Sequence, residues 1–293
     1  MRLIDSHAHL QAAAFASDRG AVIGAARAAG VERILVPGWD ASSSAAAVSL
    51  AREWEVDAAV GVHPHDAELT TDDDWAAIVD LAAAPEVVAI GETGLDYDRT
   101  HSPLEAQLDN LRRHLRLSLD TGKPAILHCR SAPGQRDAQD ALIAELRAAG
   151  FGGATARSAF GQSPPAVLHS YSGPPDYAAA ALEMGIAIAF GGLVFRNGEE
   201  ASAEVVRLVP AELLLTETDS PYLAPPGVPR GSGPGFSGRR NSPEWVRITA
   251  EWVIQQRGET ADTIGAGLVR AYDATFRLRS KAWPSWSTGY RPV

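Results

Sequence analysis

The amino-acid sequence predicts an α/β fold, a single (β/α)8 barrel of the TIM type. Eight short apolar runs, typical of parallel strands buried on both faces, are mostly separated by helical patterns. Six of the runs carry His, Glu or Asp at or near their carboxyl ends, as expected at the carboxyl-terminal rim of a barrel, where functional residues lie. The length of 293 residues suits one such barrel, for which about 250 residues are typical. An open doubly wound sheet is the alternative, but no G-x-G-x-x-G motif follows the first run.

The predicted strands follow one another at the spacing of βαβ units. Each run is short and nearly continuous, so we expect helices to cover its outer face. In chain order the runs are LIDSHAHL from residue 3, RILVPGWD from 33, AAVGVHPH from 58, VVAIGETGLD from 87, PAILHCR from 124, AVLHSYSG from 166, IAIAFGGL from 186 and LLLTETDSP from 213.

Several predicted helices have recognisable starts. Thr71 is followed by three aspartates, which the positive end of a helix dipole favours. The sequence from Ser102 to Glu105 predicts a capping box with proline in the first turn. The barrel domain is predicted to span residues 1–276. A Gly-, Ala- and Ser-rich stretch at about 150–165 is interpreted as an inserted loop or mobile flap, and residues 277–293 as a C-terminal tail.

The composition excludes some classes of function. The formal net charge of −10 argues against a general nucleic-acid coat and against an anionic membrane surface, because both need a basic face. An enzyme that meets phosphates through metal ions stays possible. The single cysteine, Cys129, permits no internal disulfide. Because we find no apolar leader and no apolar run of membrane-spanning length, we expect a cytoplasmic protein without membrane association, and a monomer.

The residues at the ends of the runs form a candidate metal centre. His7 and His9 are one residue apart, so both imidazoles point to the same face of an extended strand. Six imidazole and carboxylate ligands are too many for one catalytic zinc, and they suit two divalent ions about 3.5–4 Å apart. Without a thiolate, such a site fits Zn, Mn, Fe, Ni or Mg. The predicted ligands are His7, His9, Glu92, His128, His169 and Asp219.

A bridge between two ions needs two oxygens, and Glu92 is the predicted bridging carboxylate. A carboxylated lysine or a Schiff-base lysine does not fit, because Lys123 precedes the fifth run and Lys281 lies in the tail. Asp219 is predicted to bind one ion and to accept the proton of a water whose pKa the metal lowers. Asp5, one step deeper on the same side, is predicted to orient a ligand imidazole.

Seven motifs, in this order, resemble the TatD family of metal-dependent deoxyribonucleases, which belongs to the amidohydrolase-like barrel hydrolases. The resemblance covers residues 1 to about 275. The motifs are DSHAHL at 5–10, GVHPH at 61–65, GETGLDY at 91–97, KPAILHCR at 123–130, HSYSG at 169–173, TETDSPYL at 216–223 and RRNSP at 239–243.

The resemblance implies a metal-dependent hydrolase that cleaves DNA phosphodiester bonds in the manner of an exonuclease, mainly in single strands or at 3′ ends. It implies one ion on His7 and His9 and a second on His128 and His169. Glu92 would bridge the two ions, and Asp219 would act as ligand and base. The implied substrate-facing residues are His63, which is also a candidate catalytic residue, Arg130, Arg240 and Asn241.

Two other functions stay open. One is a two-metal hydrolase of a small amide, ester or lactone, since this barrel and these ligands serve many substrates. The other is a binding factor that has kept the metal site. The negative net charge mildly favours a small substrate. DNA is favoured by the family motifs and by arginines that could hold phosphates, unless they are solvated loop residues: Arg196, Arg230, Arg239 and Arg240.

Overall fold

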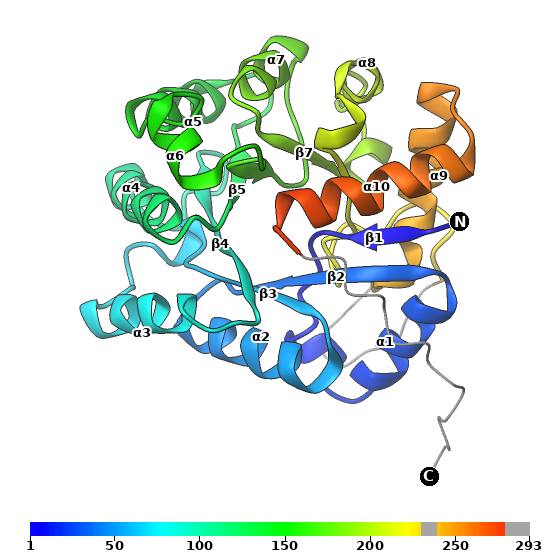
Figure 1. The fold of residues 1–293 in the computed structure, drawn as a ribbon, viewed down its shortest axis with the longest axis horizontal. Coiled ribbons are helices and arrows are strands. Elements are labelled where there is room, and N and C mark those ends of the chain that lie inside the picture. Colours follow the sequence, from blue (N-terminus) through cyan, green and yellow to red (C-terminus); the bar gives the residue numbers. More distant parts are fainter. Residues whose placement is uncertain (230–238, 279–293) are drawn as a thin grey trace.

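The computed structural model describes residues 1–229 and 239–278 and confirms the predicted barrel. Eight strands form one parallel sheet in chain order, each pairing with the next. Helices surround the strands on the outside (Figure 1). The strands are β1 (Leu3–Asp5), β2 (Val31–Pro37), β3 (Asp57–Val60), β4 (Val87–Asp96), β5 (Ala125–Arg130), β6 (Ala166–Leu168), β7 (Ala187–Phe190) and β8 (Leu214–Thr216).

Hydrogen bonds between the first and last strands bring the ends of the sheet together. Ser6 donates from both its backbone N–H and its hydroxyl to the carbonyl oxygen of Thr216, at 3.0 and 3.1 Å. The Thr216 hydroxyl donates to the carbonyl oxygen of Ile4 at 3.0 Å. A parallel bridge between Ala8 and Ser220 continues this contact beyond the strands. The residues that follow β1 and β8 therefore lie side by side at the carboxyl-terminal rim.

The helices are α1 (Arg19–Ala28), α2 (Ala41–Trp54), α3 (Asp72–Ala82), α4 (Leu104–Thr121), α5 (Asp137–Ala148), α6 (Ala154–Phe160), α7 (Pro175–Glu183), α8 (Ser202–Leu208), α9 (Val246–Arg257) and α10 (Ala261–Thr275). Short 3-10 turns accompany them: η1 (Ala13–Phe15), η2 (Pro64–Asp66), η3 (Gly192–Phe195), η4 (Ala211–Leu213) and η5 (Pro243–Trp245). Among the described residues, no helix is long and apolar enough to cross a membrane.

One predicted helix start is confirmed and one is wrong. Thr71 caps α3, with its hydroxyl accepting from the N–H of Asp74 while the Asp74 carboxylate accepts from the N–H of Thr71. Ser102 does not cap α4. Its hydroxyl instead donates to the carbonyl oxygen of His65 at 2.8 Å and accepts from the N–H of Glu68 at 3.1 Å. This serine therefore ties the rim segment after β3 to the start of α4.

The strands are buried because the packed interior of the barrel covers their inner face and the surrounding helices cover their outer face. Ile4, Leu35, Ile90, Leu127 and Ile188 each expose none of their surface. Complete burial of one such side chain stabilises the fold by roughly 1.5–3 kcal/mol. This continuous burial explains why the strands could be read as unbroken apolar runs.

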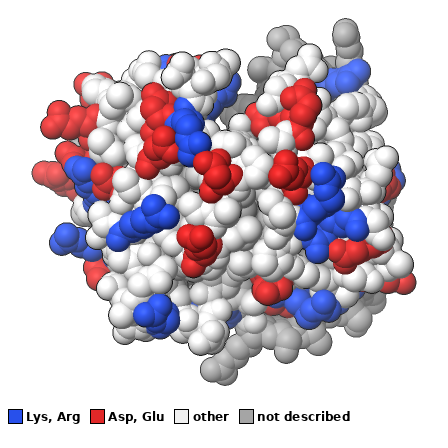
Figure 2. All heavy atoms as spheres, turned by 90° about the horizontal axis from the view of Figure 1, so that it is seen from above, with Lys and Arg blue, Asp and Glu red and all other residues white. Residues whose placement is uncertain are grey.

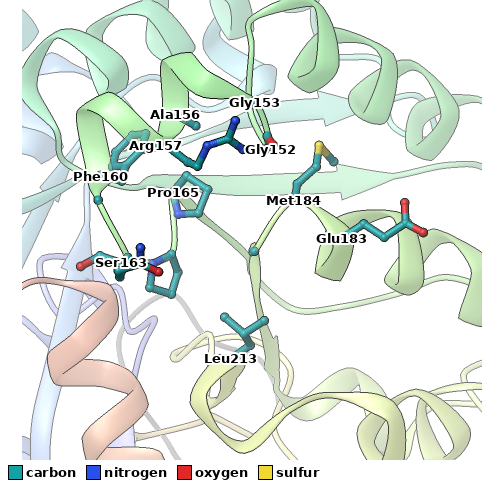
Figure 3. A pocket seen from close by; sticks show the side chains of 14 residues that line it. Gly152, Gly153, Ala156, Arg157, Phe160, Ser163, Pro165, Glu183, Met184 and Leu213 are labelled. Carbon is teal, nitrogen blue, oxygen red and sulfur yellow. Dashed lines mark hydrogen bonds between the residues drawn. The ribbon is translucent and has the colours of Figure 1, made fainter.

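The stretch at about 150–165 lies at the opposite end of the barrel from the predicted metal ligands. It contains a helix, α6, in the connection between β5 and β6. A cavity of about 260 Å³ lies beside it, lined by Phe160, by Pro165 before β6 and by Leu213 before β8. Figure 3 shows this cavity with Arg157 and Met184 at its edges. Because α6 lies at the amino-terminal ends of the strands, it is not placed to cover the carboxyl-terminal rim, and the stretch is partly helical where an inserted loop was expected.

Candidate active site

Glu92 lies at the centre of the carboxyl-terminal rim with only 3% of its side chain exposed. Glu92 was predicted to lie at the end of the fourth strand, but β4 spans the whole fourth run to Asp96 and pairs with β5 beyond Glu92. The register between β4 and β5 shifts between Ile90 and Thr93, so Glu92 stands at an irregularity of the ladder. Gly94 permits the close approach that follows, because a side chain there would collide with the backbone of His128.

The two carboxylate oxygens of Glu92 face different sets of histidines. Oε2 lies 3.1 Å from Nε2 of His7 and 3.6 Å from Nε2 of His9. Oε1 lies close to one ring nitrogen on each of three further histidines: Nε2 of His169 at 2.9 Å, Nδ1 of His128 at 3.3 Å and Nε2 of His63 at 3.4 Å. Burial acts to raise the pKa of Glu92, but the surrounding histidines, led by His169, hold it well below its usual range.

Asp219 completes the cluster from the β8 side. Its Oδ1 lies 3.4 Å from Nε2 of His9 and 3.8 Å from Nε2 of His7. Burial acts to raise the pKa of Asp219, and the close imidazoles of His9 and His7 lower it below its ordinary value. The N–H of Asp219 donates to the carbonyl oxygen of His7, and the N–H of His9 donates to that of Ser220. The two rim segments thus hold each other in place by backbone hydrogen bonds.

Two outer partners orient the imidazoles of His9 and His169. Nδ1 of His9 faces the carbonyl oxygen of Pro37 at 3.3 Å, so Nδ1 carries the proton and Nε2 offers a lone pair to the cluster. Glu217 Oε1 lies 3.2 Å from Nδ1 of His169. Carboxylates that hold the far nitrogen of an imidazole are characteristic of histidines that bind metals.

His128 lies beside a second carboxylate, that of Asp96, without a hydrogen bond to it. Its Nε2 lies 3.4 Å from Oδ2 of Asp96, while Nδ1 points to Glu92. Glu217 and Asp96 were not among the predicted site residues. A signal was present, since Asp96 follows Glu92 by four residues and therefore lies on the same face of an extended strand. Glu217 precedes Asp219 by two residues in TETD.

The cluster fits divalent metal ions. Nε2 of His7 and Nε2 of His9 lie only 3.2 Å apart, and two such nitrogens approach so closely only when a proton or a cation lies between them. Imidazole and carboxylate donors without a thiolate suit first-row divalent metals and Mg. Among the described residues, ligand atoms lie within 4.8 Å of one another in three groups: His7, His169 and Asp219; His7, His9 and Glu92; His63, Glu92 and His128.

His63 lies beside the cluster with a different hydrogen-bonding state. Its Nδ1 accepts from the N–H of His65 at 3.1 Å, so Nε2 carries the proton that faces Glu92. Burial lowers the pKa of His63 to about 4, which keeps the ring neutral at neutral pH. The nitrogen that points inward is therefore a hydrogen-bond donor in this arrangement, unlike the lone pair of His9.

A cleft of about 1030 Å³ opens above the cluster. Arg130 lines it and forms an ion pair with Asp98 at 2.8 Å. Arg99 and Arg196 also line it, and neither guanidinium has a hydrogen-bond or ion-pair partner among the described residues. On the face shown in Figure 2, acidic and basic side chains are interspersed, so that face offers no broad basic surface among the residues coloured there.

Two predicted substrate contacts lie away from the cleft. Arg240 donates to both carboxylate oxygens of Asp18, at 2.9 and 2.6 Å, and packs over the ring of Phe15. Asn241 is fully buried, and its amide donates to the carbonyl oxygen of Thr218 at 2.8 Å. Neither side chain is part of the cleft lining. The structure therefore does not bring them together with the ligand cluster.

Three further predictions have different outcomes. Asp5 does not touch a ligand imidazole. Its carboxylate accepts from the N–H and hydroxyl of Thr218, at 2.9 and 2.6 Å, and from the backbone N–H of His7 at 3.3 Å. Arg239 is exposed and does not line the cleft. Arg230 and the tail from residue 279 onward lie outside the described residues.

Comparison with known proteins agrees with this geometry. The sequence profile of the family described as "TatD related DNase" matches residues 4–277. The chain is 36% identical over 267 residues to the 3'-5' ssDNA/RNA exonuclease TatD of Escherichia coli K12, covering 90% of this chain and 95% of that protein. It is 32% identical over 277 residues to the metal-dependent hydrolase YabD of Bacillus subtilis, covering 94% and 99%. The crystal structure of YJJV, a TatD homolog from Escherichia coli K12, superposes with a TM-score of 0.80 at 27% identity, covering 95% and 99%.

Proposed function

This chain belongs to the family of TatD-related DNases, and from that membership and the geometry of the cleft we propose that it is a metal-dependent exonuclease acting on single-stranded DNA. The relatives called 3'-5' ssDNA/RNA exonucleases support hydrolysis from the 3′ end and make RNA a second substrate to test. The observation that carries the proposal is the Glu92 carboxylate, whose two oxygens face two separate sets of histidines. Such a carboxylate is suited to hold two ions at once.

We assign His7, His9 and Asp219 to one ion and His128 and His169 to the other, with Glu92 shared between them. When bound, these ions would lower the pKa of a water molecule and stabilise negative charge on the phosphate oxygens. Glu217 and Asp96 would keep His169 and His128 in the orientation that presents a nitrogen to the cluster. The metal identity follows from none of these contacts, and Zn, Mn, Fe, Ni and Mg are all to be tested.

The side chains around the cluster divide the remaining tasks. Asp219 is ionised at neutral pH because the imidazoles lower its pKa, so it can accept a proton from the attacking water. Nε2–H of His63 can donate a hydrogen bond to a phosphate oxygen or a leaving oxygen near Glu92. For backbone phosphates, Arg99 and Arg196 offer guanidinium groups that have no partner among the described residues, and Arg130 offers one that pairs with Asp98. A cytoplasmic location and a monomeric state stay predictions.

The decisive experiment uses 5′-end-labelled single-stranded DNA and protein loaded separately with Zn, Mn, Fe, Ni or Mg. We expect stepwise shortening of the strand, its loss on addition of a chelator, and its loss in Glu92→Gln. Glu251→Gln is the matched control, because Glu251 is half-exposed on α9 and pairs with Arg247 far from the rim. Absence of shortening with all five metals would exclude the nuclease, and equal activity in Glu92→Gln would indicate a contaminating enzyme. Hydrolysis of a lactone or amide instead would support the small-substrate alternative.

A further inference from the structure

Two aromatic side chains lie next to the ligand cluster at the mouth of the cleft. Trp39 lies two residues after the end of β2, and Tyr222 lies in the turn after Asp219. Both line the cleft. The centre of the His9 ring lies 5.4 Å from that of Trp39 and 5.9 Å from that of Tyr222. Two aromatic rings therefore lie against the imidazole of a candidate metal ligand.

Tyr222 is half exposed, since 49% of the residue is accessible to solvent. Its position is nevertheless fixed by the backbone. The N–H of Tyr222 donates to the carbonyl oxygen of Asp219 at 2.8 Å, and the carbonyl of the intervening Pro221 accepts from the N–H of Asn241 at 3.0 Å. The same turn thus sets the positions of the candidate base Asp219 and of an exposed aromatic ring.

We infer that Tyr222, with Trp39 beside it, forms a stacking site for the base of a nucleotide that flanks the cleaved phosphodiester bond. The inference rests on the proposed function, because it assigns one wall of the same cleft. An exonuclease must accept every base in turn, and stacking is tolerant of sequence because each base has an aromatic face. The guanidinium groups of Arg99 and Arg196 line the same cleft and would bind the phosphates, which leaves the bases to the aromatic wall.

The test removes the ring from the protein and the base from the substrate, separately and together. The metal-loaded protein is given 5′-labelled single strands that carry either a normal nucleotide or an abasic analogue at the 3′-terminal or the penultimate position. We measure kcat/KM and, by fluorescence anisotropy, Kd. For the wild type, we expect the abasic change at one of these positions to cost roughly 5- to 150-fold, the value of one base–aromatic stack.

Tyr222→Ala should cost a similar factor on the normal strand and less than about twofold on the abasic strand, because the stack is already absent there. Tyr222→Phe should keep the dependence on the base, since the ring remains. Trp39→Leu should lower that dependence in part. Leu208→Ala, at an exposed position of α8 outside the cleft, is the control and should behave as the wild type.

The outcomes separate this inference from the proposed function. Equal costs of Tyr222→Ala on both strands at both positions would overturn the stacking site while leaving the nuclease intact. If binding depends on the base and Tyr222→Ala abolishes that dependence, but no metal supports cleavage, the stacking site is supported and the proposed nuclease activity is rejected. Neither binding nor cleavage would overturn both. Metal content is measured in every variant, because a loss of metal would affect both strands equally and would appear as an equal cost.

Discussion

His114 provides a prediction whose size follows from the structure. It lies on α4, fully buried, with Nε2 accepting from the N–H of Val62 at 3.0 Å and Nδ1 donating to the carbonyl oxygen of Asn110 at 2.7 Å. The Asn110 side chain donates to the carbonyl oxygen of Val62 at 2.7 Å. One helix thus holds both backbone groups of the residue that precedes His63. The ring can do this only while it is neutral, because protonated Nε2 cannot accept.

Burial lowers the pKa of His114 to about 3 in the folded protein, whereas an unperturbed histidine titrates near 6.5. Below pH 6.5, His114 is therefore protonated in the unfolded chain but stays neutral in the folded protein. The free energy of unfolding consequently falls as the pH falls. The loss continues until the pH reaches about 3. Between pH 7 and pH 5 it amounts to about 2 kcal/mol from this residue alone.

The measurement compares urea unfolding of the wild type and His114→Gln at pH 7 and pH 5, with the same metal loading throughout. Glutamine does not titrate in this range and can still accept and donate hydrogen bonds. The wild type should lose about 2 kcal/mol more than His114→Gln between the two pH values. Titration of the metal ligands is common to both proteins and cancels in the difference. His101→Gln, which removes an exposed histidine just before α4, is the control for the substitution itself.

The reasoning fails if both proteins lose the same stability between pH 7 and pH 5. That result would mean that His114 is protonated in the folded state, which the hydrogen bond from Val62 does not permit. A second readout is kcat in the double variant His114→Leu with Asn110→Leu, since loss of both contacts to Val62 should shift His63. An unchanged kcat in a folded, metal-loaded double variant would show that this helix does not position His63.

The remaining predictions concern the rim. Glu217→Gln should weaken metal affinity by about 10- to 100-fold, and excess metal should restore activity because His169 is still present; equal affinity in a metal titration would refute this role. Arg196→Gln should weaken binding of single-stranded DNA and reduce the slope of log Kd against log salt concentration by about 0.7, whereas Arg207→Gln on α8 should leave the slope unchanged; the opposite pattern would place the phosphates elsewhere. Asp5→Ala should cost about 1–3 kcal/mol in denaturant unfolding, because the N–H and hydroxyl of Thr218 lose their buried acceptor, and wild-type stability would contradict this.

The fold and the candidate ligands could be predicted because both leave local marks in the sequence. Strands buried on both faces are apolar throughout, so a polar residue at the end of a run is visible at once. Glu92 shows the limit of this reading. It stands inside β4 at a shift of register with β5, and the pairing that continues β4 to Asp96 depends on residues of another strand. Periodicity within one run cannot reveal such an irregularity.

The role of Arg240 could not be predicted because its partners are remote in the sequence. The motif RRNSP places it after the last strand, and a rim loop has one side toward the cleft and another toward the first helix. Asp18, more than 200 residues away, takes the guanidinium on the far side. Asn241 is likewise turned inward, where it supports the turn that carries Asp219. Their position in the sequence predicted that these two residues lie at the rim, but not whether their side chains face the cleft or turn away from it.

The net charge of −10 says little about whether the cleft can bind a polyanion, because the charges close to the ligand dominate the interaction. In the cleft, Glu92 and Asp219 face imidazoles, and Asp98 faces Arg130. Bound divalent cations would compensate the carboxylates further, while Arg99 and Arg196 keep their positive charge unpaired among the described residues. With such cations bound, an approaching phosphate would meet positive charge nearby, and screening over about 8 Å at physiological salt would weaken the effect of distant acids. The binding of a polyanion is decided by the charges within that distance, and the salt dependence of Arg196→Gln measures them directly.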